Sequence, residues 1–211
     1  MSIEKNRHFL AVAGNIGAGK SSLTQLLSSH FNWKAYCESV DDNPYLSDFY
    51  EDMTRWSFNL QIYFLSSRFR HQKDLLTMNG SFIQDRTIYE DVEIFAKNLH
   101  EMGLMSERDY MNYRSLYEEM ISYLTPPDLL IYLRADVPTL VRQIQLRGRD
   151  YENRIRIDYL EKLNVLYENW IKAYPFEKLI IETDELDFVN DKVALGKIIG
   201  LIEQRRFSLF S

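Results

Sequence analysis

The octapeptide Gly14-Asn15-Ile16-Gly17-Ala18-Gly19-Lys20-Ser21 is the most informative stretch of this chain. It matches the pattern G-x-x-x-x-G-K-S, follows the apolar run Phe9–Ala13 and precedes a helical pattern that begins at Ser22. Glycines at these positions let backbone N–H groups turn inward around phosphate oxygens, and the N-terminus of the next helix adds partial positive charge. The stretch therefore predicts a nucleotide-phosphate loop between a strand and a helix.

Two side chains of this loop have predicted roles of their own. Lys20 is expected to reach the β- and γ-phosphates, and the Ser21 hydroxyl to hold Mg²⁺. A glycine-rich turn with a chance lysine is the alternative, but such a match arises by chance in fewer than about one in a hundred chains of this length. The other residues of the predicted nucleotide site in this stretch are Gly14, Asn15, Gly17, Ala18, Gly19 and Ser22.

The loop alone does not name a reaction, because GTPases, ATPases and kinases share it. A GTP-binding switch needs the guanine-reading pattern N-K-x-D after a later strand, and the sequence contains none. The chain is also small for a motor ATPase. A small-molecule kinase is therefore the leading interpretation.

Length, charge and cysteine content restrict the remaining classes. With 211 residues, 45% of them hydrophobic, the sequence fits a single domain over 1–211. The net charge of −6 argues against a nucleic-acid partner, and the single Cys37 excludes an intramolecular disulfide. Neither a signal-peptide pattern nor an apolar run near the ~20 residues of a membrane span is present, so we expect a cytoplasmic protein without a membrane partner.

Short apolar runs alternate with long helical patterns, which is typical of a parallel α/β sheet. The fold class is therefore predicted as α/β, with a five-stranded parallel sheet and helices on both faces. The second strand, closed by Glu38, is expected to lie beside the strand that precedes the loop. The expected strands are His8–Ala13, Lys34–Cys37, Ser81–Gln84, Leu129–Leu133 and Leu179–Glu182.

Two of the predicted helices have distinctive features. Ser106 and Asp109 match a capping box ahead of an apolar stripe, so a helix is expected to begin after Ser106. The segment Arg55–Lys73 is also predicted as a helix, with apolar residues on more than one side. Such a helix is either central in the fold or shared with a partner subunit.

Acidic and basic side chains stand at the ends of two predicted strands. A kinase needs a carboxylate that takes the proton of the acceptor hydroxyl, and Glu38 is placed for this at the end of the second strand. Taken alone, Glu38 is more often a solvated acid. Asp85 and Arg86 end the third strand, at the carboxyl edge where α/β proteins bind ligands, with a structural ion pair as the alternative.

Taken together and in order, five motifs resemble those of the deoxyribonucleoside kinase family, which includes deoxycytidine and deoxyguanosine kinases. They extend over most of the chain. The resemblance implies a P-loop kinase fold that moves the γ-phosphoryl group of ATP, with Mg²⁺, onto the 5′-hydroxyl of a deoxyribonucleoside, commonly as a homodimer. The motifs are the loop itself, Glu38-Ser39-Val40, Arg55-Trp56-Ser57-Phe58 with Gln61, Asp85-Arg86-Thr87-Ile88-Tyr89-Glu90-Asp91, and Arg147-Gly148-Arg149.

The resemblance also implies catalytic roles. Glu38 corresponds to the base at the 5′-hydroxyl, and Arg86 to the partner that steadies this carboxylate and the developing charge. With Lys20 they form the expected catalytic set. Asp85 corresponds to the acid that helps Ser21 to hold Mg²⁺.

A nucleoside pocket follows from the same resemblance. Gln61 corresponds to the glutamine that bonds the base edge, Arg68 and Asp91 to a charged pair at the far edge of the base, and Phe95 to an aromatic ring stacked on it. Gln61 and Arg68 are seven residues apart, about two helical turns or ~10 Å, and therefore share a helix face. Without the resemblance, both would more often be solvated.

The sugar and the pocket wall are assigned in the same way. Tyr50 corresponds to a tyrosine that donates to the 3′-hydroxyl, and Glu152 to its acidic partner. An apolar wall is expected from Ile16, Val40, Leu46 and Phe49, for each of which core packing is an equal alternative.

A short basic lid is expected at about 147–154. Arg147 resembles the lid arginine that stacks on the ATP adenine, and Arg149 one that lies near the phosphates. Where the family often carries a further arginine this chain has Gln143, with Arg142 beside it. Asp187 and Phe188 resemble the loop over the adenine, although a phenylalanine that seats the next helix is an equal alternative.

The charged pair predicts a substrate ranking. The 5-methyl group of thymine would press on Arg68 and Asp91, and desolvating a charged pair against a methyl group is unfavourable. Purines instead offer ring nitrogens and an exocyclic group that Gln61, Arg68 and Asp91 can bond. We therefore expect a purine substrate, deoxyadenosine slightly ahead of deoxyguanosine, with deoxycytidine third and thymidine poorest. The rivals are a nucleoside monophosphate kinase, which would need cations where this chain has Tyr50 and Glu152, and a non-catalytic nucleotide-binding module.

Overall fold

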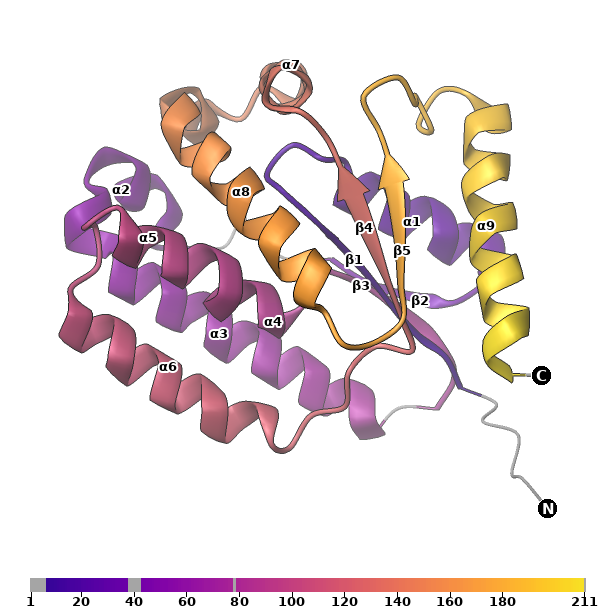
Figure 1. The fold of residues 1–211 in the computed structure, drawn as a ribbon, viewed down its shortest axis with the longest axis horizontal. Coiled ribbons are helices and arrows are strands. Elements are labelled where there is room, and N and C mark those ends of the chain that lie inside the picture. The colour runs from indigo at the N-terminus through magenta and orange to yellow at the C-terminus, as the bar shows by residue number, and fades with distance from the viewer. Residues whose placement is uncertain (1–6, 38–42, 78, 211) are drawn as a thin grey trace.

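The computed structural model describes residues 7–37, 43–77 and 79–210, and it contains a five-stranded, all-parallel sheet in the order β2-β3-β1-β4-β5 (Figure 1). The predicted parallel α/β fold is thus confirmed. All five expected strands form, with ends that differ from the expected ones by one residue at most. The strands are β1 (Phe9–Gly14), β2 (Lys34–Tyr36), β3 (Phe82–Asp85), β4 (Leu129–Arg134) and β5 (Lys178–Glu182).

The order of the strands corrects one expectation. The second strand does not lie beside the loop strand, because β3 is inserted between them and pairs Val12 with Asp85 on one side and Tyr36 with Gln84 on the other. Every residue of β3 is buried, whereas β2 is short and partly exposed. A buried strand belongs in the sheet interior and a short, exposed one at its edge. Asp85 is therefore the strand-end acid directly beside the loop strand.

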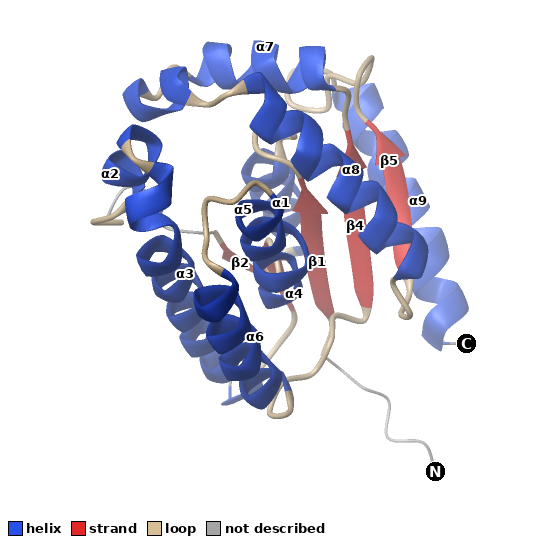
Figure 2. Ribbon diagram, turned by 60° about the vertical axis from the view of Figure 1, so that its left-hand side comes forward, coloured by secondary structure: helices blue, strands red, loops and turns tan. Residues whose placement is uncertain are grey.

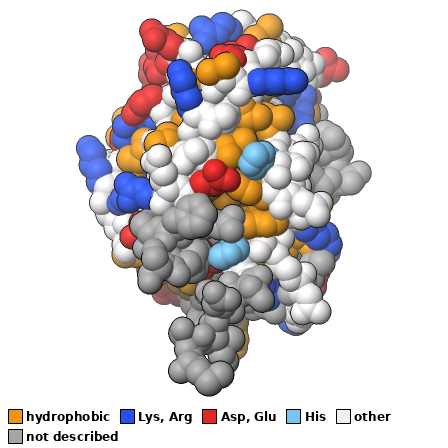
Figure 3. Space-filling model, turned by 90° about the vertical axis from the view of Figure 1, so that its right-hand side faces the viewer, with side chains coloured by type: hydrophobic (Ala, Val, Ile, Leu, Met, Phe, Trp, Pro, Cys, Tyr) orange, Lys and Arg blue, Asp and Glu red, His pale blue; other side chains and the backbone are white. Residues whose placement is uncertain are grey.

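Side chains of β1 alternate between two hydrophobic cores, as the period of a strand requires. Leu10 and Val12 pack with helices α1 and α9, and Ala11 and Ala13 with helices on the opposite face. Figures 1 and 2 show both layers, and Figure 3 looks onto the side that carries α9, where apolar side chains gather between charged ones. The helices of the α1 layer are α1 (Lys20–Phe31) and α9 (Lys192–Phe210).

More helices pack on the opposite face of the sheet. They are α3 (Met53–Thr77), α4 (Ile88–Glu90), the π-helix η1 (Asp91–Ala96), α5 (Lys97–Glu101), α6 (Glu107–Ile121) and α8 (Ile157–Ala173). The predicted cap of α6 is confirmed, since Ser106 Oγ accepts a hydrogen bond from the Asp109 backbone N–H at 3.1 Å. Helix α3 is longer at both ends than the predicted Arg55–Lys73. One side of it packs against α2, α6 and η1.

Three short elements lie where the strands end, at the edge to which the arrows point in Figure 2. They are α2 (Leu46–Glu51), α7 (Val137–Arg147) and the 3₁₀-helix η2 (Asp150–Arg154). Together with the loop after β1 they enclose the carboxyl edge of the sheet. Within the described ranges, no helix has both the length and the apolar character needed to cross a bilayer.

Candidate functional site

The predicted phosphate loop connects β1 directly to α1. Its backbone demands glycine at Gly19, where φ is +88° and a Cβ atom would lie 2.8 Å from the ring of Phe188. Gly17 has the same φ, and a Cβ there would meet Leu140 O at 2.8 Å. The pattern of glycines in the sequence thus reflects both left-handed backbone and close packing beneath the loop.

Lys20 opens helix α1 and points into the loop. Its Nζ donates to Asn15 O at 2.8 Å, and the side chain is buried. Burial, and next the positive charge of Arg86, lower the pKa of Lys20 from 10.5 to about 7, although Asp85 and Glu90 act in the opposite direction. A buried cation of this kind is stabilised when phosphate oxygens bind beside it.

Ser21 and Asp85 supply oxygen atoms next to Lys20. Ser21 Oγ donates to Asp85 Oδ2, and Asp85 Oδ1 is buried without a hydrogen-bond partner among the described residues. A buried acceptor left without a partner is costly. Hydroxyl and carboxylate oxygens are ligands that Mg²⁺ prefers, so the pair fits such an ion. In the described part of the chain, no group of three or more His, Cys, Asp or Glu side chains is placed to hold a metal ion.

Arg86 follows Asp85 in an unusual backbone conformation. Its φ is +66°, which is rare for a residue with a Cβ and persists only where the surroundings hold it. The Arg86 backbone N–H donates to Val12 O at 2.9 Å, and the guanidinium carbon lies 4.2 Å from the ring centre of Phe95. The guanidinium also donates to the hydroxyl of Tyr167 at 3.1 Å.

A cavity that encloses about 800 Å³ of space, the open solvent at its mouth included, extends from the phosphate loop along α3. It brings together most of the predicted substrate residues from elements that are far apart in the sequence. Those on its wall are Ile16, Leu46, Phe49, Tyr50, Gln61, Arg68, Arg86, Asp91, Phe95 and Glu152, with Gly17, Lys20, Ser21, Asp85, Arg147 and Arg149 from the predicted nucleotide site and lid.

The inner part of the cavity holds a charged pair. Arg68 Nε and Asp91 Oδ2 are 2.6 Å apart, and both side chains are buried. Gln61 lies on the same side of α3, and its Oε1 is buried without a hydrogen-bond partner in the part of the chain that the structure describes. Asp91 and Phe95 both line the cavity from η1, a π-helix of the kind often found at functional sites.

Tyr50 and Glu152 lie at the other end, beneath the lid. Burial raises the pKa of Tyr50 well above its usual value, and the nearby Tyr159 and Glu152 raise it further, so the hydroxyl stays a neutral donor. Glu152 accepts two hydrogen bonds from Arg147, one of them from Nε at 2.9 Å, and lies 3.6 Å from Arg149 Nη1. The lid arginines thus meet at a buried carboxylate.

Some predicted residues lie elsewhere. Phe188 is buried in the core beside α9, with its ring against Gly19, and Asp187 is exposed and caps the turn at Asn190. Gly14, Asn15, Ala18 and Gly19 belong to the phosphate loop and Ser22 to α1, and none of the five is among the described residues that line the cavity. Glu38 and Val40 lie outside the described residues.

Sequence reasoning missed several residues at this site. Leu60 and Phe64 lie on the cavity wall of α3, and the spacing of Phe64 from Gln61 and Arg68 could have revealed it. Tyr151 and Tyr159 also line the cavity, and Glu90 and Tyr167 lie behind Arg86. On α8 the tyrosines recur at helical spacing, which is equally typical of core residues.

The chain matches known proteins over nearly its whole length. The sequence model of deoxynucleoside kinases matches residues 10–205. A deoxyadenosine/deoxycytidine kinase of Bacillus subtilis is 44% identical over 95% of this chain and 93% of that protein. A deoxyadenosine kinase of Dictyostelium discoideum is 37% identical over 94% of this chain and 80% of its own length.

A solved structure agrees with the sequence relatives. The deoxyadenosine kinase of M. mycoides, with the products dCMP and a flexible dCDP bound, superposes with a TM-score of 0.84 at 31% identity, over 93% of this chain and 99% of that one. The resemblance drawn from the motifs is thereby confirmed, and this chain belongs to the deoxynucleoside kinase family.

Proposed function

We propose that this member of the deoxynucleoside kinase family transfers the γ-phosphoryl group of ATP to the 5′-hydroxyl of a purine deoxyribonucleoside. One observation carries the proposal. A single cavity reaches from the phosphate loop, with Lys20, to the buried pair of Arg68 and Asp91. Such a cavity places a phosphate donor at one end and a flat, hydrogen-bonding base at the other.

At the donor end, Lys20 would neutralise the β- and γ-phosphates, with the backbone N–H groups of the loop around them. Ser21 and Asp85 would hold Mg²⁺, which supplies positive charge at the phosphates when it is bound. Arg147 and Arg149 would supply the positive charge of the lid. Their present partner, Glu152, is the predicted sugar ligand, so substrate and lid would compete for one carboxylate. Adenine contacts from Asp187 and Phe188 would require the loop after β5 to present its backbone, because the Phe188 ring is buried.

At the acceptor end, Glu38 would take the 5′-hydroxyl proton, with Arg86 beside it. Phosphoryl transfer requires positioning and charge stabilisation more than covalent chemistry. Tyr50 would donate to the 3′-hydroxyl and Glu152 accept from it. Ile16, Val40, Leu46 and Phe49 would form the wall beside the sugar and base.

The base is read from the inner wall. In the orientation that the structure shows, Gln61 offers a buried acceptor, and the exocyclic amino group of adenine or cytosine is the complementary donor. Two relatives of this chain are a deoxyadenosine/deoxycytidine kinase and a deoxyadenosine kinase, and adenine and cytosine carry that amino group on corresponding edges, at C6 and C4. This supports deoxyadenosine as the best substrate, with Phe95 stacked on the ring.

We also propose a cytoplasmic homodimer. The outer side of α3 carries half-buried apolar side chains around a groove lined by Phe58, Ile62 and Tyr63. In the proposed dimer this surface would pack against the same surface of a second copy about a two-fold axis.

The test is ADP release by the purified chain with ATP, Mg²⁺ and each of the four deoxynucleosides in turn. Deoxyadenosine should give the highest kcat/KM. A preference for deoxyadenosine monophosphate as acceptor would favour a nucleoside monophosphate kinase instead. ATP binding without ADP release from any acceptor would indicate a non-catalytic module.

A further inference from the structure

Glu90 is a buried carboxylate that lies behind the reaction site. It lies four residues after Arg86, at the end of α4, and is completely inaccessible to solvent. Neither it nor Tyr167 is among the described residues that line the cavity. A buried charge persists only when it is fully hydrogen-bonded or paired, so its contacts indicate what it does.

Both carboxylate oxygens of Glu90 are occupied by other parts of the protein. Oε2 accepts from the Thr87 backbone N–H at 2.7 Å and from its hydroxyl at 3.1 Å. Oε1 accepts from the Tyr167 hydroxyl at 2.8 Å and, at a longer 3.4 Å, from the backbone N–H of Gly14. One side chain therefore ties the turn after Arg86 to the residue that begins the phosphate loop.

The Tyr167 hydroxyl is the link between Glu90 and Arg86. A guanidinium can only donate and a carboxylate can only accept, so the hydroxyl must accept from Arg86 and give its proton to Glu90. Burial raises the pKa of Tyr167 well above its usual value, which keeps that proton in place. The order of donors and acceptors is thus fixed in one direction, from Arg86 to Glu90.

Arg86 depends on such support because its backbone is strained. A residue with a Cβ at φ +66° is strained and must be held by its surroundings. The guanidinium rests on the ring of Phe95 on one side and on the Tyr167 hydroxyl on another. Removal of the hydroxyl would take away the hydrogen bond that connects the guanidinium to Glu90.

We propose that Tyr167 and Glu90 are positioning residues that fix the Arg86 guanidinium relative to the phosphate loop. The hydrogen bonds connect Arg86 to Tyr167, Tyr167 to Glu90, and Glu90 to Gly14. They therefore hold Arg86, on the acceptor side of the site, in a constant position relative to the phosphate loop on the donor side. The inference rests on the proposed kinase function, in which Arg86 acts on the transferred phosphoryl group. Displacement of a charged group by about 1 Å lowers rates up to about 100-fold without a matching loss of binding.

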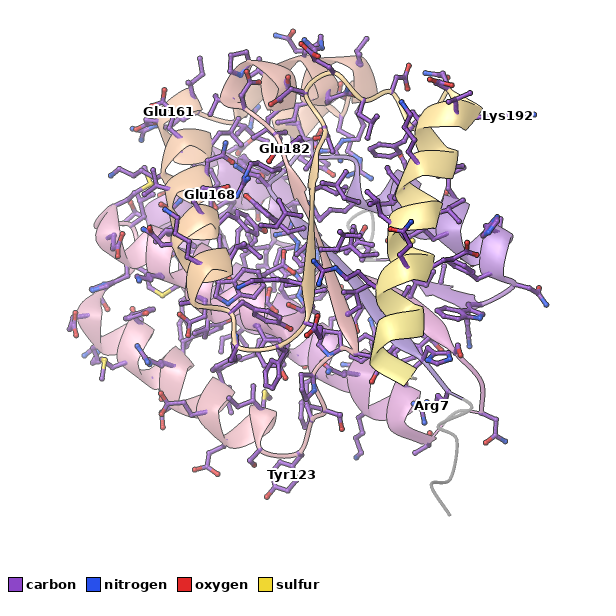
Figure 4. The ribbon with its side chains drawn as sticks, turned by 45° about the vertical axis from the view of Figure 1, so that its right-hand side comes forward. Arg7, Tyr123, Glu161, Glu168, Glu182 and Lys192 are labelled. Carbon is purple, nitrogen blue, oxygen red and sulfur yellow. The ribbon has the colours of Figure 1, made fainter. Side chains whose placement is uncertain are left out.

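The main test is Tyr167→Phe, which removes one hydroxyl and keeps the ring. The matched control is Tyr132→Phe. The two rings are stacked with centres 5.7 Å apart, but the Tyr132 hydroxyl bonds Glu168 in a network with Arg134, away from Arg86. Glu168 and Glu182, which both bond Arg134, are labelled in Figure 4 on α8 and β5.

With deoxyadenosine and ATP, Tyr167→Phe should lower kcat about 10-fold or more while both KM values change less than about 3-fold. Tyr132→Phe should stay within about 2-fold of wild type. Glu90→Gln, which puts an amide where Thr87 donates, should also lower kcat more than KM. In an Arg86→Ala background, measured with radiolabelled substrate, Tyr167→Phe should cause no further loss, because its effect acts through Arg86.

Three results would overturn the proposal. They are equal losses in Tyr167→Phe and Tyr132→Phe, a loss confined to KM or thermal stability, and full additivity in the Arg86→Ala background. If the wild-type protein is active, any one of these results refutes the positioning role and leaves the proposed kinase function standing. A wild-type protein without turnover on any deoxynucleoside removes the proposed function, and the positioning role with it.

Discussion

Arg68 on α3 and Asp91 at the start of η1 form a buried ion pair, with Nε and Oδ2 2.6 Å apart. The two residues are 23 positions apart in the sequence and meet because α3 packs along η1. Tyr113 of α6 lies behind them, and the charge of Asp91 contributes to its raised pKa after burial. A charged pair held this rigidly restricts which base can lie against it.

The pair predicts that thymidine loses a four-way competition among deoxynucleosides at equal concentration. Neutralising both partners in Arg68→Gln/Asp91→Asn should raise the thymidine-to-deoxyadenosine ratio of kcat/KM about 10-fold, because no charge is then desolvated against the methyl group. The control is the exposed pair in Arg114→Gln/Glu118→Gln, which should leave the ratio unchanged. If wild type prefers thymidine, Arg68 and Asp91 do not face the base.

Glu38→Gln preserves size and removes the proton acceptor. Loss of a general base should lower kcat by roughly 10²–10⁴ with little change in nucleoside affinity. The exposed acid Glu161, labelled in Figure 4, provides the control Glu161→Gln, for which wild-type turnover is expected. Near-normal turnover of Glu38→Gln would contradict the assignment.

Lys20 predicts uptake of a proton when ATP binds. With its lowered pKa of about 7, the Lys20 side chain is largely an uncharged amine at about pH 8.5. Bound phosphates favour the charged ammonium form and raise the pKa. Calorimetry in buffers of different ionisation enthalpy should therefore show uptake at about pH 8.5, and much less at about pH 6, where Lys20 is already charged. ATP affinity should fall as the pH rises above about 7.

Lys20→Ala is the matching variant. It should keep the fold, abolish the extra proton uptake and reduce turnover severely, because the phosphates lose their buried cation. Unchanged ATP kinetics in the folded variant would show that the nucleotide site lies elsewhere.

Tyr50→Phe tests recognition of the sugar. Wild type should discriminate against 3′-deoxyadenosine analogues and against ribonucleosides, because an unpaired buried donor is costly and the ring crowds the 2′ position. The variant should lose about 10-fold of the discrimination against 3′-deoxy analogues. Tyr123→Phe, an exposed tyrosine after α6, is the control. Equal use of ribose and deoxyribose by wild type would refute the role of Tyr50.

The groove on α3 predicts the oligomeric state. Light scattering should give twice the chain mass for wild type, and Ile62→Asp should shift the protein toward monomer by placing a charge in the interface. Lys73→Asp, an exposed change further along α3, should remain dimeric. A monomeric wild-type protein would contradict the proposed assembly.

Much of the fold and of the site could be predicted because the signals are local. The cap at Ser106, the loop from Gly14 and the five apolar runs each depend on spacing within a few residues. The groups at the strand ends followed from the fold class, since parallel strands bring their carboxyl ends to one edge. Gln61 and Arg68 reach the same cavity because their spacing of seven keeps them on one helix face.

Other features could not be predicted from the sequence, because they depend on which helices and strands pack together. The expected order of the strands was wrong, because neighbours in a sheet are chosen by burial, and β3 is fully buried whereas β2 is partly exposed. Phe188 had two equal interpretations, and only its ring position against Gly19 places it in the core. The bonds of Glu90 to Tyr167, 77 residues away, have no periodic signal.

By itself the sequence determined the class of this protein and predicted the chemical groups of the proposed reaction site, because local patterns and a family's ordered motifs are written along the chain. The tertiary structure alone decided that Asp85 lies beside the loop strand, that Arg86 adopts a left-handed backbone, and that Glu90 reaches back to Gly14. These contacts depend on how helices α3, α8 and η1 bury their apolar faces against one sheet, and hydrophobic burial acts on area without regard to distance along the sequence.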